Sequence, residues 1–309
     1  MWIEQYEKLM FADELKEENI KKAVKLKYQN MPDFFYKYRA FNSDTIDAFK
    51  NDILYFSSIT MLNDPFECAM VLQDRKMKDF TYSKLINIIK PFLQPEVQLK
   101  PQDFCQDSFM SEEVLKKLDI VPSDLEEYKL LVDYTNKCTK LLSYETPKDL
   151  AQIADDTYRI CSFSETMDNI LMWSHYANSH TGFCIGYNFK EVNNDFTELM
   201  LPVRYSNNRF EISDSYFPKI NELILMDALT RKFKSWEYEK EWRIWIGART
   251  KEKVQPEKVP VPKNIYFGSR MSEADKKILI DIAKSKDIDV YQMHEDSNDV
   301  KLYSEIVDS

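Results

Sequence analysis

Apolar residues recur at helical spacing in the first 30 residues of the chain. Ile20, Ala23, Val24 and Leu26 stand between lysines and glutamates and fall on one side of a helix with 3.6 residues per turn. The pattern predicts one or two surface helices over residues 1–30. We expect this segment to end at Met31-Pro32, because proline disfavours the helical conformation of the residue before it.

Residues 33–75 change to short aromatic runs, which are typical of strands. The runs FFYKYRAF (34–41) and ILYFSS (53–58) predict two strands. Between them, Asn42-Ser43-Asp44 supplies candidate N-caps for a helix over 45–51. The second run leads into Asn63-Asp64-Pro65, a combination that favours a rigid turn. This segment therefore predicts a strand, a helix, a second strand and an ordered loop.

Residues 76–156 have a mainly helical pattern that is interrupted by prolines. The clearest amphipathic runs are EEVLKKLDI and SDLEEYKLLVDYTNKCTKLLSY. The segment carries no candidate chemistry. We interpret it as a helical insertion into a β-containing core, where it could form a lid or a surface for a protein partner.

Short runs rich in aromatic residues recur from residue 157 to the end of the chain. Apolar runs predict strands at YRICSFS (158–164), FCIGYNF (183–189), VRYS (203–206), WEYEKEWRIWIG (236–247), NIYFG (264–268) and IDVYQM (288–293). Helices are predicted over 169–177 with Asp168 as N-cap, over 218–235, and over 273–286 with Ser272 as N-cap.

These elements predict an α+β fold with a mixed or antiparallel, aromatic-rich sheet, a helical insertion and peripheral helices. We expect a single domain over 1–309. Its parts would be an N-terminal helical segment (1–30), an α+β core (33–75 and 157–309) and the insertion (76–156). The strand–helix–strand at the C-terminal end would add a parallel edge to the sheet.

Composition narrows the possible functions. With only 4 glycines among 309 residues, the chain contains neither GxGxxG nor GxxxxGK[ST], which disfavours a Rossmann dehydrogenase or a P-loop NTPase. A net charge of −10 argues against a broad nucleic-acid footprint. The five cysteines form no CxxC, and the chain has neither a long apolar run nor a signal-peptide pattern. A cytoplasmic protein with reduced thiols and no membrane span is therefore expected.

The sharpest candidate for chemistry is the charged row within residues 236–247. On a single strand, Glu237, Glu239, Glu241 and Arg243 would share one face, and carboxylates two residues apart would lie about 6.5–7 Å from each other. Repulsion could raise the pKa of one of them, or Arg243 could pair with one and leave another free. Such a row could bind a ribose hydroxyl, stabilise an oxocarbenium ion or act as a base. The alternative is a solvated edge strand with cross-strand ion pairs.

Two shorter patterns accompany this row. Lys37 and Arg39 share a strand face, where an arginine fork could hold phosphate; alternatively, Arg39 pairs with Glu67 or Asp64. The hydroxyls of Ser162 and Ser164 face the same way and could support carboxylates of a site, although plain strand polarity would also account for them.

Further candidates lie on loops and on one helix. The loop Asn63–Glu67 follows a strand that contains Ser57, and such loops commonly contact ligands. Two of the three histidines fall within residues 172–180, but with Cys161 and Cys184 they fit no zinc spacing. We therefore expect no metal site there, and we interpret His175 as a structural or ligand-contacting group.

Four stretches together resemble a bacterial family, the domain of unknown function family 2971. They are YKYRAFN (36–42), LYFSSITMLNDPFEC (54–68), CSFSETMDNILMWSHYANSHTGFCIGYNF (161–189) and KSWEYEKEWRIW (234–245). This resemblance implies a shared fold unit and candidate site residues. It implies no reaction, because the family has none assigned.

A more remote resemblance does imply a reaction. Arg39, then Ser162-Phe163-Ser164, then Glu239-Lys240-Glu241 follow the order found in ADP-ribosyltransferases of the Arg/Ser-x-Ser/Glu-x-Glu type. It implies that Arg39 holds the phosphates of NAD and that Ser162 helps to place NAD and the catalytic carboxylate. Glu241 would bind the nicotinamide ribose and stabilise the transition state, while Glu239 would activate the acceptor. Tyr38, Tyr55 and Trp173 would stack on the bases. Besides Tyr55 and the two glutamates, the residues expected to bind NAD are Arg39, Tyr38, Ser57, Asn63, Asp64, Ser162, Ser164, Trp173 and His175.

On this hypothesis the protein is an NAD-using enzyme, a candidate toxin or defence effector, whose acceptor is a protein or a nucleic acid. One alternative is a metal-dependent nuclease or phosphodiesterase that uses Asp64, Glu67, Glu239 and Glu241. Another is a non-enzymatic module of a defence or toxin–antitoxin system that binds a protein partner through residues 76–156.

Overall fold

The computed structural model describes residues 2–12, 16–64, 66–68, 70–72, 147–191, 196–212 and 222–307. Of the predicted insertion, only helix α7 (Pro147–Thr157) falls within these ranges. The chain forms two compact units: Met1–Cys68, Ile153–Arg209 and Glu222–Ser309 make the first, and Ala69–Gln152 with Phe210–Asn221 makes the second. In the second unit, β3 (Met70–Leu72) and β8 (Phe210–Ile212) pair in parallel.

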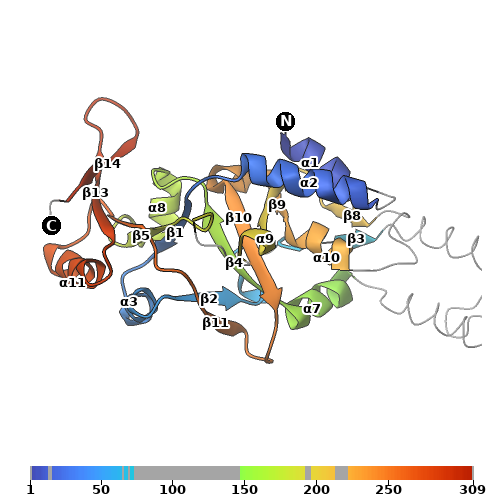
Figure 1. Cartoon of the computed structure of the whole chain (residues 1–309), viewed down its shortest axis with the longest axis horizontal. Helices are drawn as coiled ribbons and strands as arrows, with labels where there is room; N and C mark the ends of the chain where they lie inside the picture. Colours follow the sequence, from blue (N-terminus) through green and yellow to red (C-terminus); the bar gives the residue numbers. More distant parts are fainter. Residues whose placement is uncertain are drawn as a thin grey trace, which may run out of the picture. The chain divides into compact units, whose positions relative to one another are not determined.

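The first unit is built on a ten-stranded sheet, which confirms the predicted α+β fold with a mixed, mostly antiparallel sheet (Figure 1). Its main path runs β11 (Val254–Lys258), β2 (Ile53–Ser57), β4 (Tyr158–Ser164), β1 (Phe35–Arg39), β5 (Phe183–Tyr187), β12 (Asn264–Phe267), β13 (Asp289–Glu295) and β14 (Leu302–Ile306). Off this path, β10 (Glu241–Gly247) pairs with β4 and with β6 (Met200–Pro202). A separate parallel pair joins β7 (Arg204–Ser206) to β9 (Arg231–Phe233).

The helices around the sheet are α1 (Trp2–Met10), α2 (Glu17–Asn30), α3 (Ser43–Lys50), α8 (Ile170–Tyr176), α9 (Phe196–Leu199), α10 (Glu222–Leu229) and α11 (Glu273–Lys284), with 3₁₀ turns η1 (Ile59–Met61) and η5 (Lys234–Glu239). The two N-terminal helices, α3, α8 and α11 begin and end close to the predicted bounds, whereas α9 was not predicted. Asn42 caps α3 through a reciprocal capping box with Thr45, and Ser272 caps α11. The predicted cap of α8 was wrong: Asn169, not Asp168, accepts hydrogen bonds from the backbone N–H groups of Leu171 and Met172.

The run 236–247 is not one strand. Residues 234–239 form the 3₁₀ turn η5, Lys240 adopts a left-handed conformation with φ of 43°, and β10 begins only at Glu241. A left-handed residue reverses the local course of the chain, so the alternation of faces holds only from Glu241 onward. The helix predicted over 218–235 is also shorter, because α10 ends at Leu229 and residues 231–233 form β9.

Aromatic side chains fill the core of the first unit. Phe35 on β1 and Trp242 on β10 meet edge-to-face with ring centroids 5.6 Å apart, and Phe163 of β4 packs against Phe35 at 6.4 Å. Trp2 of α1 stacks on Trp242 at 6.0 Å, which fastens the N-terminal helix to the core. Lys27 of α2 is buried, and its Nζ donates to three backbone carbonyls at residues 197, 198 and 200.

At the C-terminal end, β12 and β13 pair in parallel as predicted. They do not form the edge of the sheet, because β14 adds an antiparallel strand beyond β13. The sequence analysis predicted neither β14 nor β11. None of the helices in the described ranges is long and apolar enough to cross a membrane.

The sheet opens beside β4. Strand β1 pairs with β4 only at Tyr36 and Ser164, and β2 pairs with β4 only at Ser57 and Ile160. Between these two points, no strand in the described part of the chain pairs with the facing edge of β4. There, Nζ of Lys37 donates a hydrogen bond of 2.6 Å to the backbone carbonyl of Ser162. The ammonium group thus satisfies a carbonyl that a continuous sheet would have paired.

Candidate functional site

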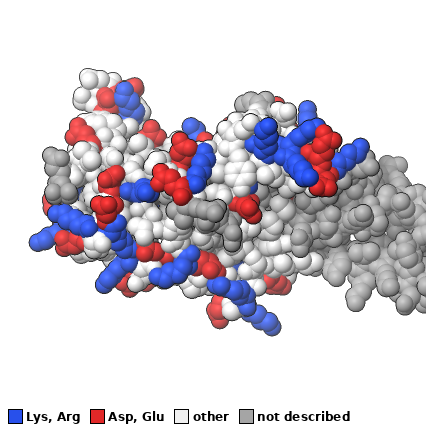
Figure 2. Space-filling view, in the orientation of Figure 1, with Lys and Arg blue, Asp and Glu red and all other residues white. Residues whose placement is uncertain are grey.

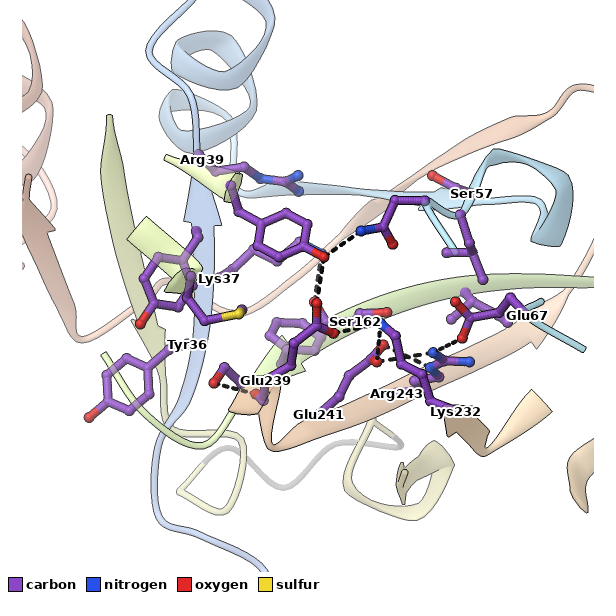
Figure 3. Close-up of a pocket in the computed structure, with 18 of the residues that line it drawn as sticks. Tyr36, Lys37, Arg39, Ser57, Glu67, Ser162, Lys232, Glu239, Glu241 and Arg243 are labelled. Atoms are coloured by element: carbon purple, nitrogen blue, oxygen red, sulfur yellow. Dashed lines mark hydrogen bonds and ion pairs between the residues drawn. The ribbon is translucent and has the colours of Figure 1, made fainter. Parts of the chain in front are cut away.

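A pocket of about 260 Å³ lies at this opening of the sheet (Figure 3). Strand β1 contributes residues 36–39 to its wall, and β4 contributes Ile160 and residues 162–164. The predicted site residues that line the pocket are Tyr38, Arg39, Tyr55, Ser57, Asn63, Ser162, Ser164, Glu239 and Glu241. Segments far apart in the sequence meet here because β1, β4 and β10 are neighbours in the sheet.

Glu241 is the most tightly held carboxylate of the pocket. It is 4% exposed, and the guanidinium of Arg243 donates two hydrogen bonds to it, from Nε to Oε1 at 2.8 Å and from Nη2 to Oε2 at 3.0 Å. Nζ of Lys232 donates to Oε2 at 3.0 Å. Burial by itself would raise the pKa of Glu241, but the charges of Arg243 and Lys232, with hydrogen bonding from Ser162, hold it well below its usual range. Glu241 is therefore ionised, with both oxygens occupied.

Glu239 and Glu67 each bind one of these two cations. Oε2 of Glu239 accepts a bond of 2.5 Å from Lys232, and Oε1 of Glu67 accepts from Nη2 of Arg243. Burial raises the pKa of both carboxyl groups, and the charge of Glu241 adds to this effect against the nearby cations. Figure 3 shows Glu239, Lys232, Glu241, Arg243 and Glu67 joined in one row of contacts.

The second oxygen of Glu239 faces a tyrosine. The hydroxyl of Tyr176 on α8 donates to Oε1 of Glu239 at 2.5 Å and accepts a bond of 2.6 Å from Nδ2 of Asn63. Burial and the charge of Glu239 raise the pKa of Tyr176, so its hydroxyl stays protonated at neutral pH. Glu239 is thus held from two sides, by an ammonium and by a phenol.

Arg39 lies apart from this row (Figure 3) and makes none of the ion pairs found in the described residues. Its Nη2 is buried without a hydrogen-bond partner there. The expected alternative of a bridge to Glu67 or Asp64 is not what the structure has: Glu67 binds Arg243, and Oδ1 of Asp64 accepts from the backbone N–H of Phe66. A buried guanidinium nitrogen without a partner has the chemistry of a site for an anion or another acceptor.

Lys37 is a second cation without a carboxylate partner among the described side chains of the pocket. Besides its bond to the carbonyl of Ser162, its Nζ lies 5.5 Å from the ring centroid of Phe163. Burial and the charge of Arg39 lower the pKa of Lys37. The β1 wall of the pocket is therefore cationic, whereas the wall formed by β9, η5 and β10 carries paired charges.

The two serines support the carboxylate segment. Oγ of Ser164 donates to the backbone carbonyl of Glu239 at 2.7 Å and accepts from the N–H of Thr166 at 3.2 Å. Ser162 stands opposite Arg243 in the pairing of β4 with β10, and Ser164 stands opposite Glu241. The Ser164 hydroxyl thus helps to fix the point at which η5 turns into β10, and the Ser162 hydroxyl bonds the carboxylate of Glu241.

Three predicted site residues do not line the pocket. Trp173 is fully buried, donates its Nε1–H to the carbonyl of Met167 and packs edge-to-face on Tyr38 at 5.2 Å, which makes it a core residue. His175 is exposed beside the ring of Tyr238. Asp64 is buried in its own turn. Helix α8 presents Met172 and Tyr176 to the pocket instead.

Sequence reasoning missed Lys232, Tyr176 and the part played by Glu67 in the network. Lys232 lies in the unremarkable run RKFK and only becomes a partner because β9 pairs with β7 beside the start of β10. Tyr176 lies in the run that was singled out for its histidines. The run Met172–His180 does contribute a polar side chain to the pocket, but that side chain is Tyr176 and not the expected His175.

The carboxylates proposed for a metal-dependent nuclease are not gathered as a metal site. Across the described ranges, no group of three or more His, Cys, Asp or Glu side chains is placed to hold a metal ion. Glu67, Glu239 and Glu241 do share the pocket, but Lys232 and Arg243 lie between them, and Asp64 is elsewhere. The face drawn in Figure 2 carries acidic and basic side chains interspersed, without a continuous basic surface.

Residues 172–244 match the model of DUF2971, described as a protein of unknown function. The match covers less than a quarter of the chain and includes these pocket residues: Met172, Tyr176, Lys232, Glu239, Glu241 and Arg243. The earlier stretches 36–42 and 54–68 lie outside the matched range. No curated protein and no solved structure matches the chain, so the comparisons lend no support to the likeness to ADP-ribosyltransferases.

Proposed function

We propose that this protein binds NAD in the pocket between β1 and β4, breaks the bond between nicotinamide and ribose, and transfers the ADP-ribosyl group to an acceptor. One observation carries the proposal: Arg39, the Ser162/Ser164 pair and the Glu239/Glu241 pair surround a single cavity. These are the five residues expected from the motif order, and they come from segments some 200 residues apart in the sequence.

The charges of the pocket suit a dinucleotide. Arg39, with its unpartnered Nη2, and Lys37 offer positive charge to the phosphates on the β1 wall. Tyr36, Tyr38 and Tyr55 line the cavity and could pack against a base. A volume of about 260 Å³ is slightly below the range of about 300–1,000 Å³ typical of small-molecule sites. It suits the nicotinamide–ribose half, with the remainder of NAD extending out through the opening.

The roles of the two glutamates follow from their contacts. Glu241 accepts three hydrogen bonds from the cations Arg243 and Lys232, and its pKa is lowered, so it supplies fixed negative charge near the reacting ribose. Glu239 has a raised pKa and lies at the cavity wall, as a general base requires. This assignment reverses the emphasis of the sequence-based hypothesis, in which Glu241 contacts the ribose directly.

In the proposed reaction the bond from C1′ of the ribose to the ring nitrogen of nicotinamide breaks, and its electron pair leaves with nicotinamide. The positive charge moves to the ribose as an oxocarbenium ion, which the carboxylates of Glu241 and Glu239 stabilise. A lone pair of the acceptor then forms the new bond to C1′. The proton released by the acceptor passes to Glu239, so that charge and atoms balance.

The test is release of nicotinamide from labelled NAD in the presence of cell extract, together with direct NAD binding by calorimetry. We expect Glu239→Gln to lower the rate of release about a hundredfold or more. Glu237→Gln is the matched control, because Glu237 lies on the same 3₁₀ turn but is exposed and outside the pocket. Release should persist with a chelator, whereas cleavage of NAD at its phosphates that stops with a chelator would favour the metal-dependent alternative. Absence of both release and NAD binding would overturn the proposal.

A further inference from the structure

Asn63, Tyr176 and Glu239 form a hydrogen-bonded chain from the surface into the pocket. Asn63 is exposed and follows the 3₁₀ turn η1, Tyr176 is partly buried on α8, and Glu239 is 3% exposed at the end of η5. The two bonds of this chain measure 2.6 Å and 2.5 Å. Three separate segments of the chain thus each contribute one polar group to a continuous series of hydrogen bonds.

The hydrogens of this chain can be counted. A phenol has one hydrogen, an ionised carboxylate can only accept, and an amide can donate through nitrogen or accept through oxygen. When Glu239 is ionised, the hydrogen of Tyr176 must point to it, and the phenolic oxygen is then free to accept from the Asn63 amide. Because Oε2 of Glu239 accepts from the ammonium of Lys232, a proton taken up by Glu239 is placed on Oε1. Protonated there, Glu239 donates to Tyr176, whose hydrogen turns toward the amide oxygen of Asn63. With Oε1 as the protonated oxygen, these two polarities satisfy every group.

We propose that Asn63 and Tyr176 form a two-state relay in which the orientation of the Asn63 amide is coupled to the protonation of Glu239. Its use in catalysis rests on the proposed function: the proton that Glu239 takes from the acceptor reverses the hydrogen bonds of the chain, and the original polarity returns when Glu239 releases that proton after the product has left. Tyr176 and Asn63 are therefore positioning residues, and Glu239 is the group that meets the acceptor.

The surroundings of Glu239 show why such a relay would matter. The titratable or charged groups that face it are Lys232 on β9, Glu241 on β10, Tyr205 on β7, Tyr176 on α8 and Tyr238 on its own turn. Lys232 divides its hydrogen bonds between Glu239 and Glu241. Burial and Glu241 raise the pKa of Glu239, while Lys232 and the hydrogen bond from Tyr176 oppose this rise. Tyr176 can thus shift the balance without a charge of its own.

The first test follows the Glu239 carboxyl group directly, in the full chain without ligand. The carbonyl stretch of protonated Glu239 is isolated by infrared difference spectroscopy, with Glu239→Gln as the subtracted reference. We expect Tyr176→Phe to move the titration midpoint upward by about one to two pH units, because the ionised form loses a donor. Tyr238→Phe is the matched control, since the contacts found for that ring are packing against His175 and Trp236. A midpoint unchanged by Tyr176→Phe would overturn the relay.

The second test separates the relay from a simple effect of charge. Asn63→Asp places an acceptor-only group at the end of the chain, which favours the polarity with protonated Glu239 and should also raise its midpoint. In the Tyr176→Phe background the same substitution should have little further effect, because the chain is already broken. An equal shift in both backgrounds would show a through-space charge and would contradict the relay. Asn298→Asp in the exposed turn between β13 and β14 controls for net charge.

The third readout is the pH profile of nicotinamide release. In Tyr176→Phe, the pH at which the release rate rises should move upward by the same amount as the infrared midpoint. The limiting rate at high pH should be reduced, and KM should change little. If wild-type protein releases no nicotinamide, the proposed function fails while the infrared midpoints still decide the relay. If release occurs but the pH at which its rate rises is unchanged by both substitutions, the relay fails while the proposed function stands.

Discussion

Arg243 binds Glu241 from two residues further along the same strand, with Nε and Nη2 donating to the two carboxylate oxygens. Residues two apart on a strand share a face, so this pairing is local and depends only on the pleat of β10. The structure has features of both arrangements expected for the glutamate row, because Arg243 pairs with Glu241 and the charge of Glu241 contributes, after burial, to the raised pKa of Glu239. The other carboxylate, Glu239, is bound instead by Lys232 and Tyr176.

Glu241→Gln should destabilise the fold. Arg243 is 1% exposed and Glu241 4%, and removal of the Glu241 charge leaves Arg243 paired with Glu67 alone and Lys232 paired with Glu239 alone in a buried network. We expect a loss of about 3 kcal/mol in the free energy of unfolding, measured by urea denaturation at neutral pH. The control is Glu257→Gln, whose partner Arg249 is exposed and whose loss should cost less than about 1 kcal/mol. Equal losses in the two variants would contradict the buried network.

The same pair predicts a pH dependence of stability. The pKa of Glu241 is held below its usual 4.5 in the folded state, so its stabilising effect is complete above the unfolded pKa and declines as pH falls below it. The difference in unfolding free energy between wild type and Glu241→Gln should therefore shrink between pH 4.5 and pH 3. Urea titrations of both proteins across this range give the difference, and a constant gap would show that Glu241 has no lowered pKa.

The part of the site that the sequence predicted rests on alternation along regular strands. Arg39 lies on β1, Ser162 and Ser164 lie on β4, and Glu241 begins β10, so each side chain points as the pleat requires. Their common pocket follows from the pairing of these strands. Glu239 reaches the same pocket for another reason, because the left-handed Lys240 turns the chain between η5 and β10. No hydrophobic pattern signals a single left-handed lysine.

The rest of the site depends on contacts between segments that have no pattern in common. Lys232 reaches the glutamates through the short pair β7–β9, whose three-residue strands are too brief to predict. On α8, Trp173 and Tyr176 are both aromatic and stand three residues apart, and only the packing of the helix decides which one is core and which one lines the pocket. Sequence reasoning favoured Trp173 and His175, and the helix presents Tyr176.

Substitutions on α8 should reproduce that division. Trp173→Ala removes a fully buried indole and should cost about 3–5 kcal/mol of unfolding free energy. His175→Ala, on the exposed side, should change the unfolding free energy by less than about 0.5 kcal/mol. Calorimetry should find NAD affinity unchanged in His175→Ala. A marked loss of affinity in this variant would restore His175 as a ligand contact.

Arg39→Ala should weaken NAD binding without destabilising the fold. No carboxylate pairs with Arg39 among the described residues, so removal of its guanidinium leaves no buried carboxylate without its partner. Loss of a charge-assisted hydrogen bond of about 1.5–3 kcal/mol corresponds to a fall in affinity of about tenfold to a hundredfold. Calorimetric titration with NAD measures the affinity, and urea denaturation measures the stability. Arg249→Ala, at an exposed arginine, is the control. A large loss of stability in Arg39→Ala would mean that the guanidinium is structural.

Lys37→Met should differ from Arg39→Ala because Lys37 has a structural partner. Its Nζ is bonded to the backbone carbonyl of Ser162 at the opening of the sheet, and methionine keeps a similar stem while leaving that carbonyl unpaired. We expect a loss of about 1–3 kcal/mol in unfolding free energy, together with weaker NAD binding because the β1 wall loses a positive charge. The measurements are those used for Arg39→Ala, with Lys234→Met at an exposed lysine as the control. Weaker binding with unchanged stability would show that the Ser162 carbonyl does not depend on Lys37, and that the opening beside β4 is maintained by the strands alone.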